Sequence, residues 1–456
     1  MMCNSGLGHL QWRIPILLLG FVLNYVSALA SSDQPIVVAG AGPAALFFSL
    51  KYLSRDPSAH VTIYEQRPRP QKSSSNQGFT GFQAFGFGLG GRAKGLFEKI
   101  PGLSERILLV TEESKMGRWY VNHQDMCAVM IDELESRYGS HGDGRLKMIF
   151  ETPVVSVKDD CSIIVETKSG EECVPYSLLI AADGINSIIR SQLVEEKLIR
   201  CSRYFRNVAW KALKLSPQPK LTPGFAQLYG QEFVRAPKKE FGGLLPRYKS
   251  QFVLLMFWRR NRSTTQTNPF NATTPDELKA KIQEQFPNVT IFPSDHVLQG
   301  FINERPGREV YMKLNKHALP KRRIALIGDT AVGMFSNLGQ GVTSGMERAN
   351  LLAETLPVSA DNANGKQNDL SRALKTFSKY SVREGHAVTD LNLMNHAWDH
   401  PWVSVGPAAG MMEVAPLINN PDLSYSELSK RPRFRKWITI GKLLWRFQRL
   451  PDNIDD

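Results

Sequence analysis

The chain has 456 residues, of which 42% are hydrophobic and 22% are charged. Such a composition is typical of a folded protein with one large domain or two interleaved domains, and it argues against a largely disordered chain. The formal net charge of +13 indicates an anionic partner, but charge alone does not decide between nucleic acid, a membrane surface and a phosphorylated cofactor.

The N-terminus carries a targeting pattern. Arg13 precedes an apolar run from Ile14 to Val26, and Ala28-Leu29-Ala30 has the small-x-small form of a cleavage site. We expect residues 1–30 to be a signal peptide, with an uncleaved anchor or an apolar helix packed on the domain as alternatives. This predicts the secretory pathway, at the endoplasmic reticulum or an associated membrane, with a plastid or mitochondrial membrane as the alternative.

A glycine turn follows the first predicted strand, residues 36–39. It reads Gly40-Ala41-Gly42-Pro43-Ala44-Ala45, and an apolar helical pattern follows it. In such a G-x-G-x-x-A motif the first glycine permits a tight turn, the second lets a pyrophosphate approach, and the last small residue lets helix and strand pack closely. A second strand ends at Glu65, which is placed to accept hydrogen bonds from an adenosine ribose. The pattern predicts a dinucleotide site rather than an ordinary β-α turn, with the candidate cofactor-binding residues Gly40, Gly42, Pro43, Ala44, Ala45, Glu65 and Arg67.

A later apolar strand, residues 177–182, runs into Asp183-Gly184. Ser187 and Arg190 follow, so this turn could simply be a helix cap with a surface cation. The sequence alone leaves two interpretations open: this helix cap, or a turn that takes part in the cofactor site.

The middle of the chain, residues 201–315, alternates like an antiparallel sheet with Gly and Pro turns. We expect it to form the substrate cavity. The aromatic residues Phe85, Trp210 and Phe257 favour an apolar or aromatic substrate, although such residues often belong to an ordinary core. Cysteines 127, 161, 173 and 201 have no C-x-x-C spacing, so no metal site is predicted.

A further apolar strand, residues 323–327, ends in Gly328-Asp329, and Gly339-Gln340-Gly341 then opens a helix that runs to about Leu356. An acid at a strand end can hold a ribityl hydroxyl, and backbone donors at a helix start can hold a pyrophosphate or the flavin carbonyl edge. The alternative is a capped β-α turn.

Residues 401–456 form a predicted basic amphipathic tail. On a helix, Phe434 and Trp445 share one face, while Arg435, Lys442 and Arg446 gather opposite. This favours either an interfacial helix on anionic lipid or a basic helix docked on the protein. No aromatic-and-basic RNA-binding pattern accompanies it, so nucleic acid is not a predicted partner.

The order of the three glycine motifs resembles the single-component FAD-dependent aromatic hydroxylases, the family of para-hydroxybenzoate hydroxylase. Within that family the chain most resembles the kynurenine 3-monooxygenases, in the mid-chain strand segments Leu244-Leu245-Pro246 and Phe252-Val253-Leu254-Leu255-Met256-Phe257 and in the late helix segment Ala387-Val388-Thr389-Asp390-Leu391. The resemblance implies an α/β fold in which a Rossmann-like FAD-binding domain, residues 31–200 and 316–400, is interleaved with an antiparallel β-sheet substrate domain, residues 201–315. It also implies FAD as cofactor and NADPH or NADH as a transient electron donor.

The resemblance also assigns roles to the motifs. The first motif and Glu65 would hold the ADP half of FAD, and Asp183 and Gly184 would lie near the flavin. Asp329 would contact the ribityl chain. The remaining candidate cofactor contacts are Gly339, Gln340 and Gly341.

Four positions depart from the family pattern. Val332 and Ser336 stand where the family has a histidine and a proline, and His123 replaces an arginine that meets the FAD phosphates. A neutral imidazole donates less strongly to phosphate than a guanidinium does. Gln83 stands where kynurenine hydroxylases carry an arginine for the substrate carboxylate, which argues against an amino-acid substrate.

The sequence therefore predicts an FAD-dependent monooxygenase that hydroxylates or epoxidises a hydrophobic, including aromatic, small molecule with molecular oxygen, through a flavin hydroperoxide. No catalytic side chain is predicted. The alternatives are a carotenoid or terpenoid epoxidase-like enzyme, a flavin reductase, and a catalytically silent flavin-binding membrane protein.

Overall fold

The computed structural model describes residues 34–70, 86–113, 119–215, 226–228, 231–235, 241–245, 247–248, 251–259, 268–287, 289, 292–358, 366–394, 414 and 416–450. Residues 1–30, Gln83 and Phe85 lie outside this part of the chain. The predicted targeting segment and two of the four substrate candidates therefore stay predictions.

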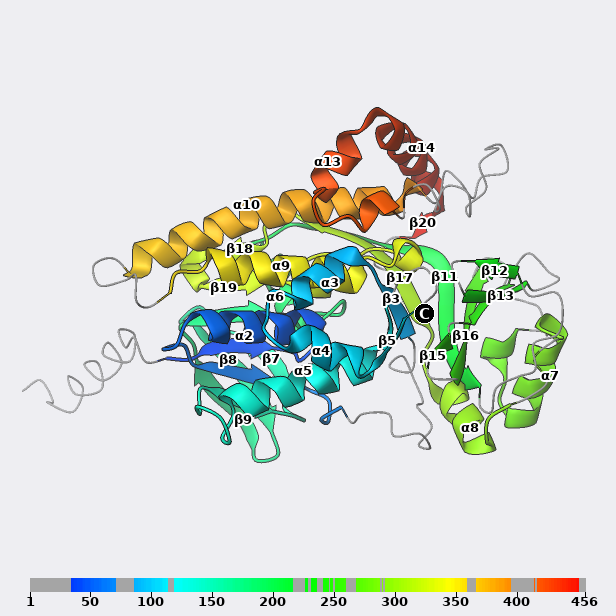
Figure 1. The fold of residues 1–456 in the computed structure, drawn as a ribbon, viewed down its shortest axis with the longest axis horizontal. Coiled ribbons are helices and arrows are strands. Elements are labelled where there is room, and N and C mark those ends of the chain that lie inside the picture. The colour runs from blue at the N-terminus through cyan, green and yellow to red at the C-terminus, as the bar shows by residue number, and fades with distance from the viewer. Residues whose placement is uncertain are drawn as a thin grey trace, which may run out of the picture.

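A six-stranded sheet contains the strands of all three glycine motifs (Figure 1). Its order is β18 (Ala318–Leu319), β19 (Ile324–Leu326), β10 (Leu178–Ala181), β1 (Ile36–Ala39), β2 (Val61–Tyr64) and β6 (Leu146–Ile149). Neighbouring strands are parallel except for β18 and β19 at one edge. The apolar strands β1 and β10 are buried along their whole length, as expected for a parallel sheet covered on both faces.

The two faces of this sheet have different covers (Figure 1). Because strand side chains alternate, Ile36 and Val38 pack with the helices α2 (Pro43–Arg55), α5 (His123–Tyr138) and α9 (Gly341–Thr355). Val37 and Ala39 pack on the other face, with α6 (Ile188–Glu195) and a small antiparallel sheet. The strands of that small sheet are β7 (Val154–Val157), β8 (Ser162–Thr167) and β9 (Gly170–Pro175).

A second large sheet is antiparallel, as predicted for the middle of the chain (Figure 1). Its main path is β12 (Ala226–Leu228), β13 (Gln231–Arg235), β14 (Phe241–Leu245), β16 (Gln251–Arg259), β11 (Cys201–Leu215) and β17 (Gly307–Leu314), with β15 (Arg247–Tyr248) and β20 (Arg449–Leu450) beside it. Helices α7 (Pro275–Gln285) and α8 (Asp295–Asn303) cover one face. The parallel and antiparallel sheets together confirm the predicted fold class, while the predicted domain boundaries stay predictions.

Shorter elements complete the body of the molecule. A three-stranded sheet contains β3 (Gly86–Leu89), β5 (Trp119–Asn122) and β4 (Thr111–Glu113). The helices α3 (Gly91–Phe97) and α4 (Leu103–Leu108) pack in the same hydrophobic core as α2.

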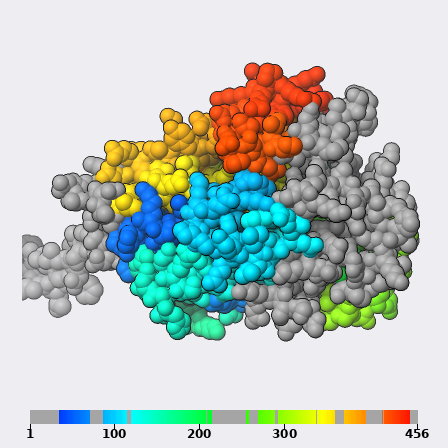
Figure 2. Space-filling model, in the orientation of Figure 1, coloured from blue at the N-terminus to red at the C-terminus, as the bar shows by residue number. Residues whose placement is uncertain are grey.

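The C-terminal helices form a raised lobe on the molecule (Figure 2). The long helix α10 (Lys366–Asn392) supports α13 (Tyr425–Lys430) and α14 (Pro432–Gln448). On α14 the predicted apolar face packs inward, with Phe434, Ile438 and Trp445 only 3%, 6% and 3% exposed. A Cβ on Gly441 would lie 2.0 Å from the Leu393 carbonyl oxygen, so the backbone of α14 packs directly against the backbone at Leu393.

This packing decides between the two interpretations of the tail. The protein itself covers the apolar face that an interfacial helix would turn toward lipid, so the structure shows the docked helix. In the part of the chain that the structure describes, no helix is both long and apolar enough to cross a membrane.

Candidate functional site

The three glycine motifs meet at one edge of the parallel sheet. Strands β19, β10, β1 and β2 are neighbours in this order, and each is followed directly by one of the predicted turns or by Glu65. Ligands of open α/β sheets bind at this carboxyl edge. The topology thus brings together candidates from positions 40 to 341 of the sequence.

The first turn is shaped by Gly40. Its φ of +98° lies in the region that favours glycine, and a Cβ there would lie 2.5 Å from the Ala182 carbonyl oxygen. At Gly42 a Cβ would meet no atom within 4 Å. Pro43 begins α2, and the small Ala44 side chain lies next to Gly328 of the third turn. The turn therefore packs against Ala182 at Gly40 and faces open space at Gly42.

Glu65 lies beside this turn. Its Oε2 accepts a hydrogen bond from the Ala41 N–H at 2.7 Å, and its Oε1 accepts one from the Arg67 N–H at 2.9 Å. The half-buried carboxylate is thus oriented at the mouth of the glycine turn, as the dinucleotide motif requires. Arg67 is exposed next to it.

The second turn is tied to the third through Thr330. The Thr330 hydroxyl donates to Asp183 Oδ1 at 3.0 Å and accepts from the Gly184 N–H at 2.8 Å. Asp183 Oδ2 accepts from the Ile189 N–H at 3.3 Å. Burial raises the pKa of Asp183, against hydrogen bonds that favour its charged form. Both carboxylate oxygens of Asp183 therefore hold protein groups, and this residue joins two turns of the site.

Arg190 corrects the surface-cation interpretation of the second turn. The side chain is 2% exposed. Its Nη2 donates to the Ile185 carbonyl at 2.6 Å, and its Nη1 donates to the Thr330 carbonyl at 3.2 Å. Ser187 caps α6 as expected, by accepting from the Arg190 N–H at 2.9 Å. The cation is internal because the carbonyls of two turns need a donor at this point.

The third turn presents Asp329 and the start of α9. The Asp329 side chain is exposed, yet the surrounding protein raises the pKa of its carboxyl by desolvation, with the charges of Arg348 and Arg190 acting in the opposite direction. Gly339 has a φ of +62°, and a Cβ on Gly339 or Gly341 would meet nothing within 4 Å. No side chain caps the N-terminus of α9.

These residues fit a flavin dinucleotide. Helices α2 and α9 both begin at this edge without a side-chain cap, so their first N–H groups are available to phosphate or carbonyl oxygens. Glu65 and Asp329 supply carboxylates for hydroxyl groups. The glycines that face open space line the same edge and are Gly42, Gly184, Gly339 and Gly341.

The departure at Ser336 is compensated by a buried carboxylate. The Ser336 N–H and Oγ donate to Glu309 Oε1 at 3.2 and 2.6 Å. Arg206 Nη1 lies 2.7 Å from Glu309 Oε2. Burial alone would raise the pKa of Glu309, but Arg206 and Ser336 together lower it. Glu309 is 5% exposed and lies on β17, so a strand of the antiparallel sheet holds the third turn where the family has a proline.

Two of the other three departures, Val332 and His123, have local explanations, and Gln83 lies outside the described residues. Val332 is 2% exposed and lies under α10, because a Cβ on Gly385 would come within 2.7 Å of its Cγ2. This position is therefore part of the core. At His123, burial and the charge of Arg67 lower the pKa to about 4, so the imidazole is neutral at pH 7. It offers no positive charge to a phosphate.

Two substrate candidates are neighbours on the antiparallel sheet. Trp210 on β11 pairs in register with Phe257 on β16, and both pack with Ala212 and Leu255. The alternate residue Lys211 donates to the Phe301 carbonyl at 2.7 Å under α8. Trp210 and Phe257 therefore lie on the sheet face opposite α7 and α8.

Sequence reasoning missed Thr330, Glu309 and Tyr425, whose contacts organise the site. Thr330 directly follows the Gly328-Asp329 motif, and this adjacency is the one signal that could have drawn attention to it. Glu309 and Tyr425 contact the third turn from distant parts of the chain. No local pattern marks them.

Comparison with known proteins adds a family match and two kinds of similarity. The family model described as "FAD binding domain" matches residues 87–369. The chain is 25% identical over 242 residues to kynurenine 3-monooxygenase 2 of Aspergillus niger, covering 50% of this chain and 47% of the relative. It is 24% identical over 302 residues to kynurenine 3-monooxygenase of Caenorhabditis briggsae, covering 60% and 59%. The chain thus spans about half of the length of the first relative and about three fifths of the second.

Solved structures show the same fold at low sequence identity. The tetrameric form of 2-methyl-3-hydroxypyridine-5-carboxylic acid oxygenase superposes with a TM-score of 0.60 at 15% identity, over 87% of this chain and 100% of that one. The anhydrotetracycline hydroxylase OxyS of Streptomyces rimosus gives 0.57 at 13%, over 90% and 75%.

Proposed function

Because the chain belongs to the FAD-binding domain family, we propose that it is an FAD-dependent monooxygenase that uses NADPH or NADH and molecular oxygen on a hydrophobic small molecule. One observation carries the proposal. Two uncapped helix N-termini, four open glycines and two carboxylates converge on one sheet edge. The kynurenine 3-monooxygenase relatives support the choice of oxygenase chemistry.

The chain's own residues would bind and orient the cofactor. The turn from Gly40 to Pro43 and the N-terminus of α2 would hold the pyrophosphate, and Glu65 would accept from a ribose hydroxyl. Asp329 would accept from the ribityl chain, and the first N–H groups of α9 would face the flavin carbonyl edge. Bound FAD would supply the redox chemistry, which no amino-acid side chain provides.

The substrate class follows from the sheet face that carries Trp210 and Phe257. These rings, with Ala212 and Leu255, form an apolar cluster on the face away from α7 and α8. An apolar surface binds ring systems and hydrocarbon chains better than charged amino acids. We therefore expect lipophilic aromatics first and isoprenoids second. Hydroxylation and epoxidation would be distinguished by the product.

The first experiment is an absorbance spectrum of the purified protein, followed by anaerobic reduction with NADPH and admission of oxygen. A flavin spectrum that bleaches and returns supports an oxygen-reactive flavoenzyme. NADPH oxidation that rises with an added substrate excludes a catalytically silent flavin protein. A product that carries one atom of ¹⁸O from labelled oxygen separates a monooxygenase from a flavin reductase.

Asp329→Ala tests the site itself. Loss of a hydrogen bond to a charged acceptor should weaken FAD binding by about ten- to a hundredfold. Asp295→Ala is the matched control, because Asp295 begins α8 and pairs with Lys279 on the outer side of the antiparallel sheet. Equal FAD affinity in the two variants would refute the assignment of Asp329.

A membrane surface is a further proposed partner. The supporting feature is a set of exposed cations on and next to α14: Arg431, Arg433, Arg435, Lys436, Lys442 and Arg446. Because the apolar face of α14 is packed inward, we expect electrostatic contact with anionic lipid rather than insertion. Cosedimentation with phosphatidylserine vesicles should fall steeply as salt is raised, and the triple change of Arg433, Arg435 and Lys436 to Gln should weaken it.

The compartment is a separate question. We propose that residues 1–30 direct the chain to the secretory pathway, with a mitochondrial or plastid membrane as the alternative. A fusion of residues 1–30 to a fluorescent protein tests this, and a cytosolic fusion would refute all three addresses.

A further inference from the structure

The C-terminal segment from residue 416 to residue 430 is bound to the third turn of the candidate site. The hydroxyl of Tyr425 donates to Gln340 Oε1 at 2.8 Å. The other end of the same amide, Nε2, donates to Asn419 Oδ1 at 3.2 Å and to the Leu338 carbonyl at 3.3 Å. Both ends of the Gln340 side chain are therefore fixed, and two of the partners come from the C-terminal segment.

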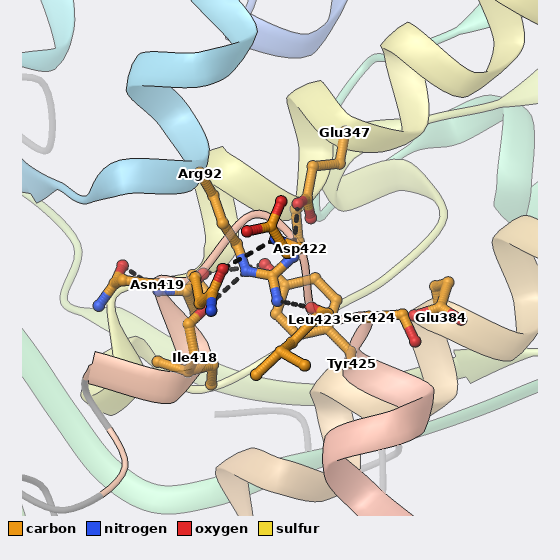
Figure 3. Close-up of polar contacts among 12 residues, drawn as sticks. Arg92, Glu347, Glu384, Ile418, Asn419, Asp422, Leu423, Ser424 and Tyr425 are labelled. Carbon is orange, nitrogen blue, oxygen red and sulfur yellow. Dashed lines mark hydrogen bonds and ion pairs between the residues drawn. The ribbon is translucent and has the colours of Figure 1, made fainter.

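Arg92 on α3 holds this segment in place (Figure 3). Its guanidinium lies 4.3 Å from the centre of the Tyr425 ring. Its Nε donates to the Ile418 carbonyl at 2.5 Å, its Nη1 lies 3.0 Å from Glu347 Oε1 on α9, and its Nη2 donates to the Leu423 carbonyl. Arg92 is 4% exposed, so this cation joins three elements in the interior.

The backbone before Arg92 is shaped for this contact. A Cβ on Gly90 would lie 2.0 Å from Asn419 Oδ1, so a larger residue there would displace the group that binds Gln340. On the far side, Ser426 donates through its N–H and Oγ to Glu384 of α10 at 3.1 and 2.6 Å. Tyr425 is thus clamped between α3 and α10 and is 2% exposed.

Within the stretch Gly339-Gln340-Gly341, only Gln340 has a side chain that can be fixed. Its neighbours Gly339 and Gly341 have no side chain and face open space. The direction of the first N–H groups of α9 therefore depends on how Gln340 is held, because no side chain caps this helix.

We propose that Tyr425 is a positioning residue for the cofactor: through Gln340 it fixes the turn that aims the N-terminus of α9 at bound FAD. This rests on the proposed function. The proposal gives residues 416–430 a role in the flavin site, in addition to their packing against α3 and α10. Tyr425 itself does not touch the reacting atoms.

The test is Tyr425→Phe in the full-length protein, which removes the hydroxyl and keeps the ring under Arg92. We expect the dissociation constant for FAD to rise about tenfold, as for the loss of one buried hydrogen bond. The visible absorption bands and the midpoint potential of the bound flavin should also change. Gln340→Ala should produce changes in the same direction and at least as large, because it also removes the contacts of Nε2 with Asn419 and the Leu338 carbonyl. The double variant should be no worse than Gln340→Ala alone, because Tyr425 acts on the turn through Gln340.

Tyr176→Phe is the matched control. Tyr176 is also 2% exposed, and its hydroxyl donates to the Arg322 carbonyl at 3.1 Å, but it precedes β10 at the opposite end of the sheet from the turns. This variant should lose thermal stability without a change in FAD affinity or flavin spectrum. If Tyr425→Phe behaves like Tyr176→Phe, its role is structural and the inference is wrong. A wild-type protein that takes up no FAD would refute the proposed function and this inference together.

Discussion

Restoring the family's proline at position 336 should damage this protein. The local backbone would accept Ser336→Pro, since Ser336 begins a 3₁₀ turn and Phe335 before it is extended, with φ −68° and ψ 153°. By itself such a change stabilises a protein by about 0.4–1 kcal/mol, through the unfolded chain. Here the substitution also removes both donors to the buried Glu309 carboxylate.

The lost hydrogen bonds outweigh the gain in rigidity. Hydrogen bonds to charged groups contribute about 1.5–3 kcal/mol each. The Oγ bond is short, at 2.6 Å, and the N–H bond is longer, at 3.2 Å, so a combined loss of about 3–4 kcal/mol is reasonable. The net expectation for Ser336→Pro is a destabilisation of about 2–3 kcal/mol. Ser336→Ala keeps the N–H donor and should be affected less.

Urea unfolding of the FAD-free protein, followed by circular dichroism, measures both variants against the wild type. FAD affinity should fall in the same order, because the third turn then loses its Glu309 contacts with the antiparallel sheet. A proline variant as stable as the wild type would show that the two Glu309 contacts contribute no more than the gain of about 0.4–1 kcal/mol from proline, which would refute the reasoning. Equal losses in the proline and alanine variants would show the same for the N–H bond alone.

Two further predictions concern the first turn and His123. Gly40→Ala should unfold more easily even without FAD, because its Cβ would meet the Ala182 carbonyl oxygen at 2.5 Å in a strained backbone. Gly42→Ala should keep the unfolding free energy of the wild type and lose FAD affinity, because its Cβ would meet no protein atom within 4 Å. Equal effects of the two changes on unfolding and on FAD affinity would contradict this. His123 has a native pKa of about 4, below the unfolded value of 6.5. Between these two pH values the unfolded chain binds a proton that the native chain does not. The free energy of unfolding should therefore fall as pH drops from about 6.5 to 4. His123→Asn should flatten that part of the pH–stability curve, and an unchanged slope would show that the imidazole is protonated in the fold.

Local patterns were sufficient for the glycine turns. The G-x-G-x-x-A motif and the Gly328-Asp329 turn were predicted because the steric demands of each turn are written in adjacent residues. The same holds for α14, where helical periodicity correctly predicted that Phe434 and Trp445 share a face. Periodicity does not say what covers that face, which is why the sequence left lipid and protein equally open.

Contacts between distant segments could not be predicted. The sequence left open whether Arg190 is a surface cation, and only the meeting of two turns puts it in the interior. Val332 and Ser336 departed from the family pattern, and the Glu309 contact that compensates at Ser336 comes from another part of the sequence. A missing family residue is therefore weak evidence of lost function until its neighbours in space are known.

The pairing of β10 with β19 sets the order in which the protein can be built. Leu179 pairs in register with Ile324, and its N–H donates to the Arg323 carbonyl at 2.8 Å. All named strands of the antiparallel sheet except β20 are synthesised between these two strands. During translation the first two turns emerge long before the third, and Tyr425 emerges later still. The nascent chain therefore has to keep one edge of the apolar strand β10 unpaired until β19 is synthesised. Chaperones would be needed at this edge. Premature termination before β19 would leave the edge exposed in an aggregation-prone product.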